Sequence, residues 1–270
     1  YIGVTGVQTC ALPICFGTYY DYLQPHSTGR AVKVNITHFA NKEISVSFRE
    51  SLRNKHLFIF GETSQHLTEL LLTIDAAKRC SVKEITVILP YYGYSRQDKR
   101  EGNRGCLGAS MIAGILQSMG IDRMVTIDLH AEQIQGFFRG IPVEHLNGRS
   151  IFVPSDASFF FHSLAADFSN KEKPWYVDFE KKWKVATPDV GGTNRALRFA
   201  KALGLSIITC NKHRDAPGSI EYMEIISGDP TDCNVLLIDD IADSCGTLAK
   251  NAELLKANGA ASVIALCTHP

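Results

Sequence analysis

Apolar positions along the chain follow two spacings, one typical of strands and one typical of helices. Strand-like runs lie at Val32–Phe39, Leu57–Phe60, Glu84–Leu89, Met124–Ile127, Lys184–Ala186, Leu205–Thr209, Val235–Ile238 and Ser262–Thr268. Helical spacing covers Gln65–Cys80, Ser110–Met119, Asn194–Leu203 and Leu248–Asn258. Glycine follows three of these helices, at Gly120, Gly204 and Gly259, and favours a helix end there. The alternation predicts an α/β fold with mainly parallel sheets covered on both faces.

The pattern breaks down between residues 146 and 184, where aromatic and charged residues mix without a clear period. Together with the turn signal Asn147-Gly148, this predicts two similar domains, at 16–146 and 147–270. Residues 1–15 are expected to be a non-native leader, because VTGVQTCALPI (residues 4–14) resembles a translated sequencing adapter. The last strand ends two residues before Pro270, so we expect the second domain to be incomplete.

Composition narrows the class of partner. The chain carries 28 basic and 28 acidic residues, so no net field attracts nucleic acid or an acidic membrane surface. No apolar run is long enough to span a bilayer. The eight cysteines are scattered without metal-binding spacing, which favours reduced thiols in a cytoplasmic protein. We therefore expect neither a nucleic acid nor a membrane as partner.

The segment from Val235 to Thr247 says most about chemistry. A buried strand is followed by Asp239 and Asp240, and a turn of small residues then leads into a helix expected near Leu248. Ligands of open α/β sheets bind beyond the carboxyl ends of strands, and helix N-termini favour phosphate. The pattern indicates a sugar phosphate held by its phosphate in the turn and by its diol at the two acids. Acidic capping residues of an ordinary strand–turn–helix fit the same pattern.

Two further strand ends leave their roles open. The loop Tyr91–Arg100 places cations among aromatic residues, which suits a polyphosphate and a purine ring, or a solvated basic loop. Asp128 and His130 lie two residues apart, so strand alternation would place both on one face. They could share a divalent ion, contact phosphates or serve the fold alone.

Three more segments carry candidate residues. Asp189 precedes a Gly-Gly turn and fits magnesium, ribose or a simple N-cap. Lys212-His213-Arg214 lies on an expected mobile loop, where two cations could neutralise a transferring phosphoryl group; surface basic pairs are commoner. Phe39 to Glu43 could contact adenine, although core packing of Phe39 is the favoured interpretation.

Taken together, these segments occur in the order of one family: PYYGYSRQDKR (90–100), DLHAEQIQGFF (128–138), TPDVGG (187–192), Lys212–Arg214 and IDDIADSCGT (238–247). Over residues 31–270 the sequence resembles the ribose-phosphate diphosphokinases, or phosphoribosyl pyrophosphate synthetases. The resemblance implies two phosphoribosyltransferase-like domains, an ATP side followed by a ribose 5-phosphate side. It implies Mg²⁺-dependent transfer of a diphosphoryl group from ATP to the C1 hydroxyl of ribose 5-phosphate. It also implies a homo-oligomer, often a hexamer, with a regulatory paralogue as a further candidate partner.

The resemblance also implies roles for individual residues. ATP contacts fall on Phe39, Asn41, Glu43, Arg96, Gln97, Asp98 and Lys99. Metal contacts fall on Asp128, His130 and Asp189, and the catalytic cations are Lys212 and Arg214. Ribose 5-phosphate contacts fall on Asp239, Asp240, Asp243, Ser244, Cys245, Gly246 and Thr247. Ser51 and Arg53 fall where allosteric phosphate contacts would lie.

Departures from the family pattern leave two alternatives. Arg139 stands where many members carry an acid, which is expected to weaken a second metal site, and the 146–184 segment is longer than usual. One alternative is a non-catalytic regulatory subunit, against which the chain keeps Lys212, Arg214 and the 243–247 turn. The other is a phosphoribosyltransferase, which leaves the 91–100 and 128–138 segments unexplained.

Overall fold

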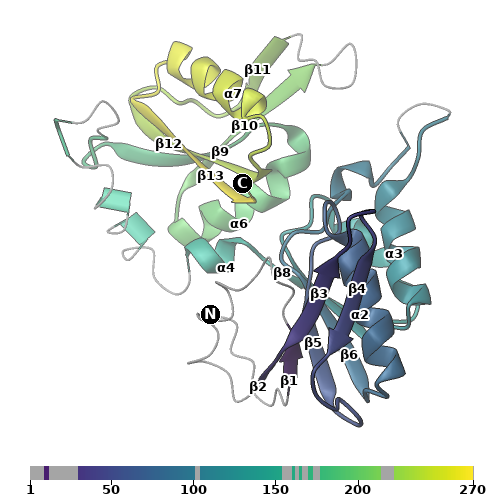
Figure 1. Ribbon diagram of the computed structural model, residues 1–270. Helices are drawn as coiled ribbons and strands as arrows, with labels where there is room; N and C mark the ends of the chain where they lie inside the picture. The colour runs from purple at the N-terminus through teal and green to yellow at the C-terminus, as the bar shows by residue number, and fades with distance from the viewer. Residues whose placement is uncertain are drawn as a thin grey trace. The chain divides into compact units, whose positions relative to one another are not determined.

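The computed structural model describes residues 9–11, 30–100, 104–153, 160–161, 164–165, 170–172, 177–213 and 222–269. The chain divides into two compact units, Tyr1–Leu146 and Asn147–Pro270. Each unit contains its own parallel-stranded sheet with helices packed on it (Figure 1). The α/β class expected from the sequence is confirmed.

The first unit is built on a six-stranded sheet in the order β2-β1-β5-β6-β7-β8. Its strands are β1 (Thr9–Ala11), β2 (Arg30–Val32), β5 (His56–Phe60), β6 (Glu84–Leu89), β7 (Arg123–Ile127) and β8 (Val143–Leu146). All neighbouring strands are parallel. Their carboxyl ends therefore meet at one edge of the sheet, as a ligand site of an open α/β sheet requires.

Helices α2 (Leu67–Arg79) and α3 (Gly108–Ser118) cover one face of this sheet. Leu70 and Ile74 of α2 share a core with Ile112 of α3 and with Val87 of β6. The sheet's other face carries a smaller cluster centred on Ile88. Coverage of both faces is therefore not found for the part of this unit that the structure describes.

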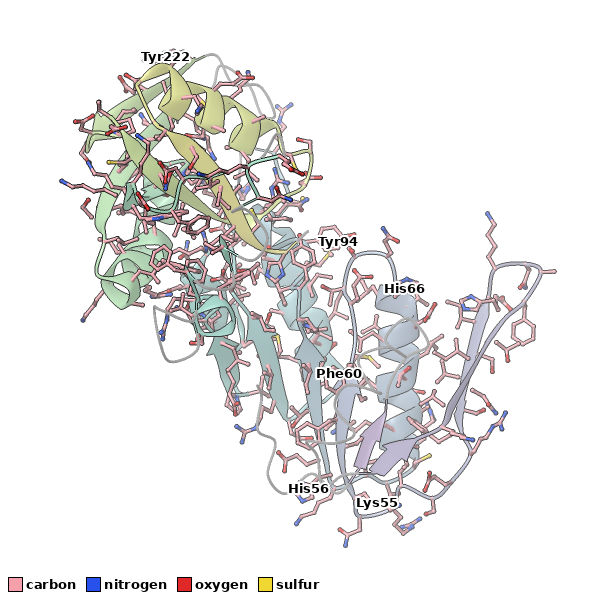
Figure 2. All side chains as sticks on the ribbon, turned by 90° about the vertical axis from the view of Figure 1, so that its left-hand side faces the viewer. Lys55, His56, Phe60, His66, Tyr94 and Tyr222 are labelled. Atoms are coloured by element: carbon pink, nitrogen blue, oxygen red, sulfur yellow. The ribbon has the colours of Figure 1, made fainter. Side chains whose placement is uncertain are left out.

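A hairpin of β3 (Val34–His38) and β4 (Ile44–Phe48) packs on the side of α2 that faces away from the sheet (Figure 2). The sequence predicted one strand over Val32–Phe39; β4 was missed, although its residues ISVSF alternate between apolar and polar as strand residues do. The short strand β1 was also missed. It lies between β2 and β5 within the segment expected to be a leader, and it pairs through its backbone, which requires no apolar pattern.

The second unit is built on a five-stranded sheet in the order β11-β10-β9-β12-β13. Its strands are β9 (Lys182–Thr187), β10 (Ser206–His213), β11 (Tyr222–Ser227), β12 (Cys233–Ile241) and β13 (Ser262–His269). Only β10 and β11 pair antiparallel among these strands; the other neighbours are parallel. The polar-flanked edge strand β11 was not predicted from the sequence.

Helices α6 (Thr193–Leu203) and α7 (Gly246–Ala257) cover opposite faces of this sheet (Figure 1). Leu236 of β12 packs in the core that contains Phe199 of α6. Its neighbour Leu237 points to the other face and packs in the core that contains Leu255 of α7. Successive strand residues point to opposite faces, so the continuous apolar run of β12 serves both cores. A short helix, α4 (Arg149–Phe152), precedes this sheet.

The three glycines predicted to end helices are confirmed in this role. Gly120, Gly204 and Gly259 have φ of 76°, 68° and 91°, in the left-handed region that glycine adopts without strain. Helix α7 begins at Gly246, two residues before the expected start near Leu248. Residues 246 and 247 are small and polar, so the apolar period from which the start was inferred does not reach them.

Candidate active site

The second unit gathers acids and cations where its central strands end. Asp189 follows β9, while Asp239 and Asp240 are among the last three residues of β12, the strand paired with β9. Lys212 lies near the end of β10, on the other side of β9. The parallel register of these three strands brings together side chains that are far apart in sequence.

Asp189 is held in place from two directions. Its carboxylate accepts a hydrogen bond from the Gly192 amide at 3.0 Å, as the N-cap of a short 3₁₀ turn, and forms an ion pair with Lys212. The hydroxyl of Thr187 donates to the Asp189 carbonyl at 2.8 Å. The capping interpretation of Asp189 is therefore confirmed, and its second oxygen faces a cation.

Lys212 corrects the prediction of a mobile loop. The strand β10 continues through Lys212 to His213, where the sequence placed its end at Thr209. The cause is β11, which pairs with this extension residue by residue, Lys212 lying opposite Met223. Arg214 lies outside the described residues.

Asp239 and Asp240 are neighbours with different environments. Asp240 is 4% exposed, and an oxygen of its carboxylate lies 3.5 Å from a guanidinium nitrogen of Arg195 on α6. Burial, followed by the negative charges of Asp240 and Asp189, raises the pKa of Asp239 to about 7. Burial, followed by the charges of Asp239 and Asp240, raises the pKa of Cys267 to about 12; Cys267 lies opposite Asp239 on β13. The end of β12 is therefore a region of concentrated negative charge.

This charge predicts a pH dependence of stability. An acid with a higher pKa in the folded than in the unfolded chain binds its proton more tightly when folded, so its contribution falls as pH rises through that pKa. For Asp239, the free energy of unfolding of the unliganded protein should fall between about pH 4 and about pH 7. Urea unfolding of the protein and of Asp239→Asn across this range tests the effect. The difference between the two should grow with pH, and parallel curves would contradict it.

The turn after β12 has the form of a phosphate loop. Residues 243–246 are exposed, and α7 begins at Gly246 directly after Cys245, whose φ of 58° is left-handed. The first amides of a helix lack intrahelical partners and face an incoming anion. The side-chain Nδ2 of Asn251, buried on α7, donates to the Thr247 carbonyl at 2.9 Å. Asp243, Ser244, Cys245, Gly246 and Thr247 thus lie together at one helix N-terminus.

In the first unit, the loop after β6 is fixed by buried contacts. Tyr92 is 1% exposed, donates its hydroxyl hydrogen to the Ala109 carbonyl at 2.8 Å and packs edge-on against Phe138. The loop then turns at Tyr94, with φ of 62°, into the 3₁₀ turn Ser95–Gln97. After the buried Tyr92, the loop exposes three of the predicted ATP contacts, Arg96, Gln97 and Lys99.

This loop also contacts the second of the quoted motifs. The carboxylate of Asp98 accepts a hydrogen bond from Gln133 at 3.0 Å, and the side-chain oxygen of Gln97 accepts one from the Cys106 thiol at 3.2 Å. Gln133 lies in η4 (Glu132–Phe137), within the 128–138 segment. The structure thus brings two sequence motifs together at one edge of the first sheet.

Gly93 provides a test of how strictly this loop is fixed. Its amide donates to the Thr63 hydroxyl at 2.8 Å, and a Cβ there would lie 3.0 Å from the Ser64 nitrogen and 3.1 Å from the Thr63 carbonyl carbon. Gly93→Ala is expected to lower the free energy of unfolding by about 1–3 kcal/mol through this overpacking. Gly114→Ala is the matched control: Gly114 is exposed on α3, and a Cβ there would have no atom within 4 Å. This substitution should raise the free energy of unfolding by about 0.5–1 kcal/mol. Chemical denaturation measures both, and equal effects would contradict the prediction.

Asp128 and His130 do not share a strand face as predicted. β7 ends at Ile127, and Asp128 adopts a left-handed φ of 48°. Its side chain is 2% exposed, whereas His130 is exposed, so strand alternation does not relate the two side chains. The Asp128 amide still donates to the Leu146 carbonyl of β8 at 2.8 Å, and the left-handed φ at Asp128 then turns the backbone away from the strand direction.

The hairpin tip places Phe39, Asn41 and Glu43 in solvent. Phe39 is 51% exposed, so the favoured interpretation that it packs in the core was wrong. Asn41 accepts a hydrogen bond from the Glu43 amide at 3.1 Å and shapes the tip. His38 lies 3.4 Å from Glu69, which ties the tip to the first turn of α2; Figure 2 labels His66 at this end of the helix.

The remaining predicted positions lie on the surface. Ser51 and Arg53 are exposed on either side of the fully buried Leu52, and Arg139 is exposed after η4. Six cysteines that the structure describes are free, in agreement with scattered reduced thiols: Cys80, Cys106, Cys210, Cys233, Cys245 and Cys267. Within the described parts of the chain, no helix has the length and apolar character needed to cross a membrane.

The donors present suit a divalent magnesium ion. Carboxylate oxygens are its preferred protein ligands, and a bound cation would offset the repulsion between Asp239 and Asp240 that adds to burial in raising the pKa of Asp239. Among the residues described, no three His, Cys, Asp or Glu side chains are grouped so that they could hold one metal ion. Asp128 and His130 belong to the first unit and Asp189 to the second.

The sequence reasoning missed Arg195. The signal was its spacing: Arg195 lies four residues before Phe199 and next to Ala196, on the apolar stripe of α6. An arginine on the buried face of an amphipathic helix requires an anion nearby. The sequence reasoning also missed that Lys212 lies on a strand, because it did not predict β11, the strand that pairs with this part of β10.

Comparison with known proteins agrees with this arrangement. Residues 24–120 match the family model for the N-terminal domain of ribose phosphate pyrophosphokinase, and residues 164–269 match that for the phosphoribosyl transferase domain. The chain is 45% identical over 240 residues to ribose-phosphate pyrophosphokinase from Porphyromonas gingivalis, covering 88% of this chain and 70% of the relative. It is 43% identical over 238 residues to the enzyme of that name from Campylobacter jejuni, covering 87% and 70%.

A solved structure extends the agreement to three dimensions. The crystal structure of phosphoribosylpyrophosphate synthetase from Mycobacterium smegmatis is similar with a TM-score of 0.82 at 31% identity, over 97% of this chain and 81% of that one. The resemblance inferred from the motifs is thereby confirmed. Sequence identity, matched domains and fold together show that this chain belongs to the ribose-phosphate pyrophosphokinase family.

Proposed function

We propose that the protein transfers the diphosphoryl group of ATP to the C1 hydroxyl of ribose 5-phosphate, giving 5-phosphoribosyl 1-diphosphate and AMP. The observation that carries the proposal is the end of β12, where paired acids adjoin an exposed helix N-terminus. In a ribose phosphate, the diol can bind the paired acids and the phosphate dianion can bind the helix N-terminus. Its place in the family gives the same reaction, as the names of its relatives indicate.

The second unit binds ribose 5-phosphate in this proposal. The backbone of residues 243–247 holds the 5-phosphate, with the side chains of Ser244 and Thr247 as further donors. Asp239 and Asp240 accept hydrogen bonds from the ribose hydroxyls. The sugar is thereby oriented so that its C1 hydroxyl is the group presented for reaction.

The first unit binds ATP. Arg96 and Lys99 contact the phosphates, with Gln97 and Asp98 as polar contacts, and Phe39, Asn41 and Glu43 contact the adenine. The proposed Mg²⁺ contacts are Asp128 and His130 in this unit and, separately, Asp189 in the second unit; a bound Mg²⁺ would neutralise charge on the phosphates of ATP. No covalent enzyme intermediate is required, because phosphoryl transfer depends mainly on positioning and electrostatic stabilisation.

The transfer step needs the cations at the end of β10. The C1 oxygen forms a bond to the β-phosphorus while the bond from that phosphorus to the α–β bridging oxygen breaks. AMP departs with that oxygen, and the hydroxyl proton passes to solvent. Lys212, together with Arg214, stabilises the negative charge that develops on the transferring group.

The oligomer and the compartment are part of the proposal. Free cysteines support a reducing, cytoplasmic location, and the family resemblance supports a homo-oligomer, often a hexamer. Light scattering of the purified protein would show six copies in that case. A monomer at micromolar concentration would contradict the assembly without affecting the reaction.

Phosphorus NMR tests the reaction class. With ATP, Mg²⁺ and ribose 5-phosphate, we expect a new diphosphate ester and AMP, with no inorganic phosphate released. A second sample with 5-phosphoribosyl 1-diphosphate and a purine base tests for a phosphoribosyltransferase. Nucleotide formation in the second sample only would contradict the proposal. Inactivity in both, from folded protein, would favour the regulatory-subunit alternative.

A further inference from the structure

Arg195 has an unusual location for a residue of its type. It is the third residue of α6, and its side chain is 10% exposed. Ala196 and Phe199 of the same helix are buried at 0% and 1% exposure. Removing a guanidinium from water is costly unless an anion compensates it.

Asp240 supplies that anion. Its carboxylate oxygen lies 3.5 Å from a guanidinium nitrogen of Arg195, and its side chain is 6% exposed. A pair buried on both sides has little solvent screening, so each partner fixes the charge and orientation of the other. Arg195 remains protonated at any ordinary pH, so the Asp240 carboxyl group always has a positively charged neighbour.

The pairing divides the two acids of β12 into different roles. Adjacent strand residues point to opposite faces, and Asp240 is directed toward the α6 side, where Arg195 lies. Its neighbour Asp239 is more exposed and is not part of this pair. Without a cation at Asp240, two adjacent carboxylates would repel each other in a partly buried site. Arg195 offsets that repulsion through its contact with Asp240.

Arg195 also connects the elements that carry the site. Helix α6 begins at Thr193, immediately after the turn that contains Asp189. The Arg195–Asp240 pair links this helix to the last residues of β12, three residues before the phosphate loop begins at Asp243. Arg195 therefore joins the helix that follows the Asp189 turn to the strand that carries the acidic pair.

We propose that Arg195 is a positioning residue for ribose 5-phosphate: by pairing with the buried Asp240 carboxylate, it holds that carboxylate in the orientation that contacts the ribose hydroxyls. This inference rests on the proposed function. It assigns to α6 a part in sugar recognition, distinct from the transition-state role of Lys212.

The test compares Arg195→Met and Arg195→Lys with unaltered protein in steady-state AMP formation. Loss of one well-placed charged hydrogen-bond acceptor for the sugar corresponds to roughly a ten- to hundred-fold rise in KM for ribose 5-phosphate. We expect that rise in Arg195→Met, with the KM for ATP within about two-fold of the original. Arg195→Lys, which keeps the charge, should recover most of the affinity. Lys201→Met, which removes an exposed cation from the last turn of the same helix, is the matched control and should change neither constant.

A double variant covers the case in which Arg195→Met does not fold. Removing both partners of a buried ion pair is often nearly neutral for stability, so Arg195→Met with Asp240→Asn should fold. Its KM for ribose 5-phosphate should equal that of Asp240→Asn alone, because Arg195 acts through Asp240. A further rise in the double variant would overturn the inference.

The remaining outcomes are distinguishable. Active unaltered protein together with an unchanged KM in Arg195→Met would overturn this inference and leave the proposed function intact. An equal rise in both KM values that lysine does not reverse would show a purely structural role and would also overturn it. Absence of ribose 5-phosphate-dependent AMP formation in unaltered protein would overturn the proposed function and the inference with it.

Discussion

Replacing Lys212 with alanine is expected to reduce the turnover of ribose 5-phosphate-dependent AMP formation by about 10²–10³-fold. Lys212 is a cation fixed on a strand, and it forms an ion pair with Asp189 in the same site. A preorganised cation stabilises charge that develops on the transferring phosphoryl group without rearranging during the reaction. Turnover from single-turnover and steady-state assays measures the loss.

The fold should survive this substitution. The backbone of Lys212 pairs with Met223 whatever its side chain, and Asp189 keeps its hydrogen bond from Gly192. Far-UV circular dichroism and thermal unfolding should therefore remain close to those of the unaltered protein. The control Lys201→Ala removes an exposed lysine of α6 and should keep full turnover. Near-normal turnover in Lys212→Ala would contradict the role.

Asp239→Asn is expected to weaken the apparent affinity for ribose 5-phosphate by roughly ten- to a hundred-fold, the value of one hydrogen bond to a charged group. The same change should stabilise the unliganded protein above about pH 7. It removes the acid whose pKa burial and the neighbouring carboxylates raise to about 7, and with it the cost of ionising that acid in the folded state. Binding and stability therefore move in opposite directions, which simple misfolding does not produce.

Isothermal titration with ribose 5-phosphate and urea unfolding measure the two effects on the same samples. Asp75→Asn is the matched control, since it removes an acid from an exposed ion pair on α2 in the first unit. Such a pair contributes little to stability, so both measurements should remain unchanged. An unchanged affinity in Asp239→Asn would refute the ribose contact.

The sequence was most informative where one residue type determines the local structure. The apolar run before Asp239 predicted β12, and three glycines predicted helix ends that the structure contains. The quoted motifs predicted the family because chemistry-bearing residues occur in a fixed order at strand ends. These features depend on short-range patterns, which a single sequence contains in full.

The parts that sequence reasoning missed depend on partners distant in the chain. β11 is a strand because β10 lies beside it, and Lys212 is fixed for the same reason. Asp128 takes a left-handed conformation at the end of β7, where its amide bonds to Leu146, eighteen residues later. Arg195 reaches its partner Asp240 only because α6 packs against β12. Periodicity along the chain contains none of this pairing information.

The most direct test of the central claim is AMP release from ATP and Mg²⁺, with and without ribose 5-phosphate, by protein expressed from its complete coding sequence. We predict that AMP appears only with ribose 5-phosphate and in equal amount to 5-phosphoribosyl 1-diphosphate. Folded protein that releases no AMP under these conditions, or that converts ATP to ADP, would contradict the assignment of this chain as a diphosphoryl-transfer enzyme.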